Sequence, residues 1–255
     1  MMSPDTHFFS PPNPSPAVTH MAEEAPGLRP KLWTASSYGW TELVRQLLAE
    51  EVDIEEKGGQ QETTPLHEAA VGGHEQISRL LLEHHADVSA LETDGSTPLM
   101  EAAMWGHETV ARLLIEHQAD VSAKDANGGT ALHFAACTEH ETVVRLLLDK
   151  GADEQMQMNG GETALWCAAY IGQETVVRLL LDKGANEQTQ SNDGHTPEDV
   201  AVDKGYHQIA AMLKAAGVRR THCVAFAMGH HERLGGGSPV LELDAGVLRM
   251  VLEQV

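Results

Sequence analysis

A short pattern that begins with threonine recurs along this 255-residue chain in steps of 33 residues. Four full copies read TPLHEAA, TPLMEAA, TALHFAA and TALWCAA, and a shorter fifth copy reads TPEDVA. Their threonines are Thr64, Thr97, Thr130, Thr163 and Thr196. A fixed period of this length indicates a solenoid, in which stacked neighbours bury apolar surface that one unit alone could not bury.

The pattern predicts two helices in each unit. Threonine can cap the first helix, proline suits its first turn, and the Ala-Ala pair permits close packing. A break such as Gly73-His74 follows, and then a second apolar block, in which Val143, Leu146 and Leu147 fall on one helical face. Residues 124–129 have the composition of a turn at the tip of a hairpin-like finger. We therefore expect an all-α fold.

Over residues 25–217 the chain resembles the ankyrin repeat family. The resemblance implies a solenoid of helix–turn–helix units with finger loops. We call the recurring Thr-led pattern the box; the resemblance implies that its His, three residues after the Thr, bonds the Thr hydroxyl. The structural box then consists of Thr64, His67, Thr97, Thr130, His133, Thr163 and Thr196. The expected order is an N-terminal arm at 1–24, a degenerate repeat at 25–58, repeats at 59–91, 92–124, 125–157 and 158–190, a capping repeat at 191–217, and a tail at 218–255.

The two ends fall outside the period. Residues 1–24 are rich in proline and poor in large apolar residues, so we expect a disordered arm. The tail carries an amphipathic stripe, and residues 243–255 resemble the first helix of an F-box, although Asp244 replaces the usual proline. Two alternatives are open: a helix that packs on the solenoid or is a remnant, and an adaptor segment that recruits a ubiquitin-ligase subunit.

The resemblance also implies a concave groove, formed by first helices and fingers, that holds a protein partner. The variable positions after the Ala-Ala pairs are Tyr38, Val71, Met104, Trp105, Cys137, Thr138, Tyr170 and Ile171. The polar finger positions, expected to form an adaptable rim, are Gln60, Gln61, Thr93, Asp94, Ala126, Asn127, Asn159, Glu162, Asn192 and Asp193. We expect Trp105 and Tyr170 to anchor the partner, since Trp and Tyr are enriched in binding hot spots. The alternative is that this row packs between repeats.

No pattern indicates catalysis, a cofactor or a metal. Most of the 15 histidines occupy repeat positions, and the group His222, Cys223, His230 and His231 lacks paired-ligand spacing. Gly235–Gly237 is not followed by the Lys-Ser/Thr of a phosphate loop. The three cysteines show no CxxC spacing, which favours free thiols in a reducing compartment. We therefore expect a non-enzymatic binding scaffold, with the ligase adaptor as the alternative.

The net charge of −21 bears on partners and location. It disfavours nucleic acid, whose phosphates repel an acidic surface, and it favours a basic protein partner. The N-terminal residues do not read as a secretory signal, and no stretch has the roughly 20 apolar residues of a membrane span. We expect a chain that is cytoplasmic or nuclear, not secreted, and not bound to a membrane.

Overall fold

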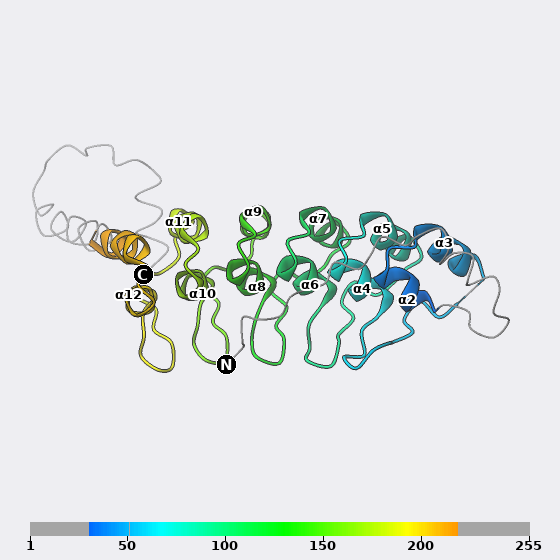
Figure 1. The fold of residues 1–255 in the computed structure, drawn as a ribbon, viewed down its shortest axis with the longest axis horizontal. Coiled ribbons are helices and arrows are strands. Elements are labelled where there is room, and N and C mark those ends of the chain that lie inside the picture. The colour runs from blue at the N-terminus through cyan, green and yellow to red at the C-terminus, as the bar shows by residue number, and fades with distance from the viewer. Residues whose placement is uncertain (1–30, 51, 219–255) are drawn as a thin grey trace, which may run out of the picture.

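The computed structural model describes residues 31–50 and 52–218, which form two parallel rows of short helices (Figure 1). The inner row is α2 (Leu32–Ser37), α4 (Pro65–Val71), α6 (Pro98–Met104), α8 (Ala131–Cys137), α10 (Ala164–Ile171) and α12 (Pro197–Asp203). The outer row is α3 (Thr41–Ala49), α5 (Glu75–Glu83), α7 (Glu108–Glu116), α9 (Glu141–Asp149) and α11 (Glu174–Asp182), followed by a helical segment at 207–218. The predicted arm at 1–24 and the F-box-like segment lie outside the described residues.

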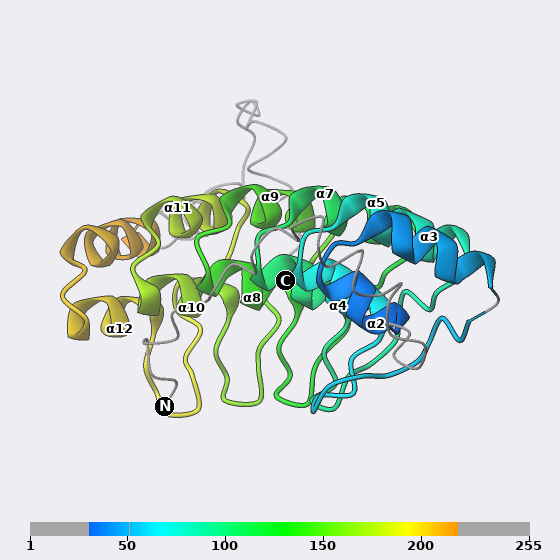
Figure 2. The ribbon, with the colours of Figure 1, turned by 45° about the vertical axis from the view of Figure 1, so that its right-hand side comes forward.

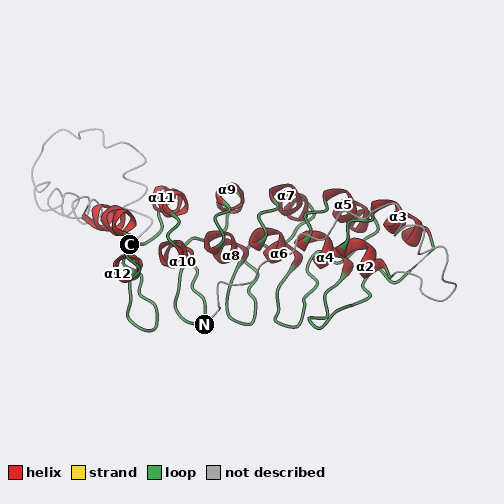
Figure 3. Cartoon of the chain, viewed as in Figure 1, coloured by secondary structure: helices red, strands yellow, loops and turns green. Residues whose placement is uncertain are grey.

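The rows form an arch, with the loops between repeats projecting beneath it as fingers (Figure 2). Figure 3 shows helices and loops alternating along the whole array. In the described part of the chain, backbone pairing outside helices includes two isolated bridges at the finger bases, Gly58 with Thr63 and Gln157 with Thr163. The prediction of an all-α solenoid with hairpin-like fingers is confirmed.

The box threonines begin the inner helices as predicted. Thr64 and His67 form a reciprocal capping box at the start of α4, and Thr196 forms another with Asp199 at α12. Pro65 occupies the first turn of α4, where its missing N–H has no intrahelical partner to lose. The Ala pairs of α4, α6, α8 and α10 are fully buried, so neighbouring inner helices can lie close together.

The core repeats with the sequence. Leu81, Leu114, Leu147 and Leu180 occupy the same place in successive outer helices, and each is 0% exposed. Burying one leucine contributes about 1.5–3 kcal/mol, and most of that contribution requires an adjacent repeat to cover it. Stability is therefore shared between neighbours, which couples their folding.

Glycines at the helix breaks make room for rings of the following repeat. Gly73 has a positive φ of 65°, and a Cβ there would lie 2.4 Å from Nδ1 of His107. Gly106 meets His140 in the same way, and Gly172 meets Tyr206. The His107 ring also hydrogen-bonds back, with Nε2 2.9 Å from the Val71 carbonyl oxygen. The break is thus also a contact between repeats.

One break departs from this rule, at Glu139. It has a positive φ of 61° without being glycine, and the following repeat has Gln173 where the others have a ring. We expect Glu139→Gly to raise the free energy of unfolding by about 0.5 kcal/mol. Left-handed backbone costs an L-residue about 1–2 kcal/mol, which exceeds the roughly 0.5–1 kcal/mol entropic cost of glycine. Urea denaturation measures the change.

A matched control is Glu116→Gly, an exposed glutamate in the last turn of α7. Glycine there should lower the free energy of unfolding by about 0.5–1 kcal/mol, because helical backbone needs no left-handed freedom. Equal losses in both variants would show that Glu139 is not strained.

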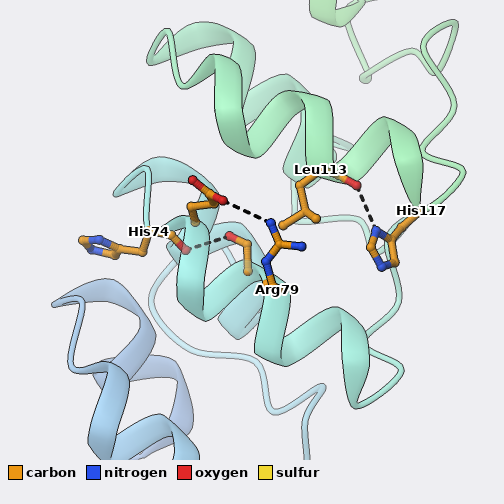
Figure 4. Close-up of polar contacts among 6 residues, drawn as sticks. His74, Arg79, Leu113 and His117 are labelled. Carbon is orange, nitrogen blue, oxygen red and sulfur yellow. Dashed lines mark hydrogen bonds and ion pairs between the residues drawn. The ribbon is translucent and has the colours of Figure 1, made fainter.

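The outer helices present charged pairs to solvent. In Figure 4 a dashed line joins the Arg79 guanidinium to a carboxylate, that of Glu75 at 3.1 Å, within α5. The Arg112–Glu108, Arg145–Glu141 and Arg178–Glu174 pairs repeat this arrangement one helix further on each time. Exposed pairs of this kind stabilise a helix by only about 0.3–0.5 kcal/mol each. Among the described residues, no helix is long and apolar enough to cross a membrane.

Candidate protein-binding groove

A line of backbone hydrogen bonds joins successive fingers. Thr93 N donates to Gln61 O, Ala126 N to Asp94 O, Asn159 N to Asn127 O, and Asn192 N to Gly160 O, each at 2.8 Å. Each link lies one repeat after the last. The fingers are therefore held in register as one continuous edge beneath the inner helices (Figure 2).

Three of the polar finger side chains also form hydrogen bonds to the preceding finger. Thr93 Oγ1 donates to the Gln61 carbonyl at 2.7 Å, and the Asn159 and Asn192 amides donate to the carbonyls of Ala126 and Asn159 at 2.9 Å. The sequence analysis predicts an adaptable polar rim here, because the sequence of one repeat does not show which groups of the next repeat a side chain contacts. Glu162 is half-buried, and the remaining predicted finger positions are exposed: Gln60, Gln61, Asp94, Ala126, Asn127 and Asp193.

The predicted row after the Ala pairs is divided between solvent and packing. Tyr38, Tyr170 and Ile171 are exposed, at 47%, 40% and 42%. The half-buried members of the row are Val71, Met104, Trp105, Cys137 and Thr138. Part of the row is therefore open to solvent, and part of it is half-buried.

Tyr170 is exposed but held in place. Its ring stacks on Trp166 at a centroid distance of 5.2 Å, and Lys204 Nζ lies 4.0 Å from the ring centroid. At the other end of the array, Tyr38 stacks on Trp40 at 5.2 Å. Aromatic surface fixed in this way loses little conformational entropy when a partner covers it.

A cluster of carboxyl groups lies beside Trp105. Glu101, only 9% exposed, accepts a hydrogen bond from Trp105 Nε1 at 3.3 Å. Its carboxyl group also shares a hydrogen bond with the carboxyl group of Glu92, at the base of the finger. Burial, with the nearby charge of Glu101, raises the pKa of Glu92 to about 8. Burial also raises the pKa of Glu101, and Asp94 and Glu68 add like charge.

The cluster joins α4, one finger and α6, so sequence spacing did not reveal it. A raised pKa on both facing carboxyls means that the pair retains a proton near neutral pH. Among the ion pairs found in the described residues, none involves Glu92 or Glu101. The described part of the array thus contains a largely buried acidic cluster in which a proton, rather than a lysine or arginine of the described residues, limits the charge.

The box histidines face inward. His67 Nδ1 lies 2.9 Å from Thr64 Oγ1, and its Nε2 lies 3.1 Å from the Ser96 carbonyl oxygen of the next finger. His133 repeats this arrangement with Thr130 and the Met156 carbonyl oxygen. Burial lowers the pKa of His67 to about 4 and also lowers that of His133. Thr64, Thr97, Thr130 and Thr163 are buried too, so the box supports the groove from within.

Metal ligands do not assemble in the described residues, where no group of three or more His, Cys, Asp or Glu side chains could hold an ion. The group His222, Cys223, His230 and His231 lies outside those residues. Two cysteines, Cys137 and Cys167, are free thiols.

Comparison with known proteins agrees with this architecture. The family described as Ankyrin repeats (3 copies) matches residues 29–92, 86–158 and 153–221. A 56-residue segment is 50% identical to part of the Ankyrin repeat and KH domain-containing protein mask of Drosophila melanogaster. That segment covers 22% of this chain and spans 1% of the length of the fly protein. The family match extends over most of the chain, with the same repeats that the helices and fingers display, and the chain therefore belongs to the ankyrin repeat family.

Proposed function

We propose that this chain is a non-enzymatic scaffold whose groove and fingers bind a basic segment of a partner protein. Ankyrin repeats are protein–protein interaction modules. The observation that carries the finer proposal is the carboxyl pair Glu92–Glu101 beside the indole of Trp105. A partner's guanidinium or ammonium group can replace the shared proton there and lie against the aromatic ring.

Long-range charge supports the same kind of partner. The net charge of −21 attracts basic segments and speeds their encounter with the groove. Tyr170 and Tyr38 offer fixed aromatic surface on either side of the acidic cluster, at 40% and 47% exposure. Binding should therefore weaken as salt rises, because the charges that steer encounter become screened.

Selection of random displayed peptides on the whole chain tests the proposal. We expect enriched peptides to combine Arg or Lys with apolar residues, and to bind the double variant Trp105→Ala/Tyr170→Ala about tenfold or more weakly. Calorimetry gives the affinities, and circular dichroism checks that helical content and melting temperature are kept. Loss of fold in the double variant would assign these residues to packing between repeats instead.

A second pair of variants isolates the acidic site. Glu92→Gln/Glu101→Gln should weaken the same peptides while removing their preference for Arg or Lys. The control Glu108→Gln lies on the outer helix α7, where its carboxylate pairs with Arg112, and should leave affinity unchanged. Peptides without basic residues, or equal losses in both variants, would contradict a basic partner.

A further inference from the structure

Two aromatic rings stand on one face of the inner helix α10. Trp166 and Tyr170 are one helical turn apart, and their rings stack with centroids 5.2 Å apart and an angle of 13° between their planes. Trp166 occupies the box position that His67 and His133 hold in other repeats, where those rings are buried. The larger indole is only half-buried there, and Tyr170 is 40% exposed. We call the Trp166–Tyr170 pair the aromatic shelf.

A positive charge of the chain itself lies on this shelf. The ammonium nitrogen of Lys204 lies 4.0 Å from the centroid of the Tyr170 ring. The face of an aromatic ring is electronegative and attracts a cation at this distance. None of the ion pairs found within residues 31–50 and 52–218 involves Lys204, so the contact with the ring does not depend on a carboxylate. The shelf therefore has the geometry of a site for a cation.

The backbone of Lys204 is fixed, but its side chain is free to leave the ring. Lys204 caps the C-terminal end of α12, where its N–H donates to the Val200 carbonyl oxygen at 3.0 Å. Two residues later the Tyr206 ring packs on Gly172, where a Cβ would lie 2.7 Å from Tyr206 Cζ. Lys204 itself is exposed, so its ammonium group can exchange the ring for water without disturbing this packing.

A lysine is held only weakly on such a ring. An exposed cation–π contact shifts an equilibrium by about two- to fivefold, and holding a lysine side chain in one place costs rotamer freedom. A guanidinium group is planar, less strongly hydrated than an ammonium group, and stacks on aromatic faces. An arginine of a segment already bound elsewhere in the groove also meets the shelf at a high effective concentration. Arginine is therefore the side chain best suited to displace Lys204.

We propose that the aromatic shelf binds an arginine of the partner, and that Lys204 occupies this site until the partner arrives. The inference rests on the proposed function and extends it to a segment with two basic residues, one for Glu92 and Glu101 and one for the shelf. Glu101 lies on α6 and the shelf on α10, two repeats further along the groove. Because Lys204 must leave before arginine can bind, this residue lowers the affinity of the chain for arginine.

Two peptides, hexaarginine and hexacitrulline, test the proposal, because their side chains have nearly the same shape and differ in charge. Calorimetry on the full chain at about 0.15 M salt, which screens long-range attraction, should show hexacitrulline binding about tenfold or more weakly than hexaarginine. Lys204→Gln should tighten hexaarginine binding about two- to fivefold, because the competing cation is gone. The same change in a Tyr170→Leu background should give no such gain.

Matched variants separate the shelf from general charge and from loss of fold. Lys124→Gln removes an exposed lysine at the start of a finger, and so measures what the loss of one positive charge contributes without any change at the shelf. Tyr170→Phe keeps a ring, and should bind hexaarginine as the parent chain does. Circular dichroism should show the same helical content in all variants.

NMR of the ε-methylene protons of Lys204 observes the exchange directly. The Tyr170 ring should shift these protons upfield in the free chain, and Tyr170→Leu should abolish the shift. Hexaarginine should return the protons towards the position of a lysine in water. Unchanged Lys204 signals at saturating hexaarginine, an equal gain from Lys204→Gln in the parent and Tyr170→Leu backgrounds, or no binding of hexaarginine would each overturn the proposal.

The same measurements distinguish this inference from the proposed function. Hexaarginine binding that is lost in Glu92→Gln/Glu101→Gln, with Lys204 signals that never move in the parent chain, would retain the acidic site and exclude the shelf. Release of Lys204 with equal affinity in the parent chain and in that double variant would retain the shelf and exclude the acidic site.

Discussion

Replacing Gly73 with alanine should lower the free energy of unfolding by about 3 kcal/mol. About 1–2 kcal/mol comes from placing an L-residue at a φ of 65°. The remainder comes from His107, whose ring lies 2.4 Å from the position of the new Cβ and must move. Movement breaks the part-buried hydrogen bond between His107 Nε2 and the Val71 carbonyl oxygen, and the loss of such a bond costs about 1 kcal/mol.

Gly151→Ala separates the two causes. Gly151 has a φ of 88°, but no atom lies within 4 Å of the point where a Cβ would stand, so only the backbone cost of about 1 kcal/mol should appear. The double variant Gly73→Ala/His107→Ala should be more stable than the sum of its single changes, because the ring is absent. Urea unfolding of the four chains measures the coupling. Equal costs for Gly73→Ala and Gly151→Ala, or strict additivity, would remove the proposed role of the ring.

Acid should weaken the fold through the buried histidines. His67 stays neutral in the native state down to a pKa of about 4, whereas the unfolded chain takes up a proton near 6.5. The stability of neutral His67 is therefore fully present above pH 6.5 and is lost as pH falls towards 4, by about 3 kcal/mol. Its cause is the burial of the ring, which penalises the charged imidazolium. His133, with a lowered pKa, acts in the same direction.

The sequence itself suggests the control variant for this prediction, because one repeat has methionine at the box histidine position. Met100 occupies the box position of His67 in the next repeat and is 1% exposed. The variant His67→Met/His133→Met should lose some stability at pH 7, with the capping bonds, yet lose much less between pH 7 and pH 4. The Glu92–Glu101 pair, whose pKa values are raised, contributes stability at low pH in both chains and cancels in the comparison. Parallel pH profiles would exclude His67 and His133 as the source.

The repeat pattern predicted what every unit has in common. The 33-residue step located the inner helices, the breaks and the buried leucines, because the same residue types meet the same neighbours in each repeat. Met100, which takes the place of the histidine in the second full copy of the pattern, is buried in the same way. These positions could be predicted because they recur in every repeat, and the recurrence is visible in the sequence.

Contacts between unlike positions could not be predicted in the same way. The Glu92–Glu101 pair, for example, joins a finger to a helix. The sequence does not show whether the Asn159 side chain faces solvent or the neighbouring finger, where it donates to the Ala126 carbonyl. Each of these contacts depends on how side chains of two particular repeats are directed, and no single repeat contains that information.

The links between fingers also determine how the molecule responds to force. Successive fingers share a backbone bond of 2.8 Å, and these links follow one another along the long axis (Figure 1). Tension applied at the two ends loads them in series, while the helices above are joined by broad apolar contact. The finger edge is therefore the compliant side of the arch. Under tension we expect the array to straighten by lengthening the distances between fingers, while the apolar contacts between its helices are kept.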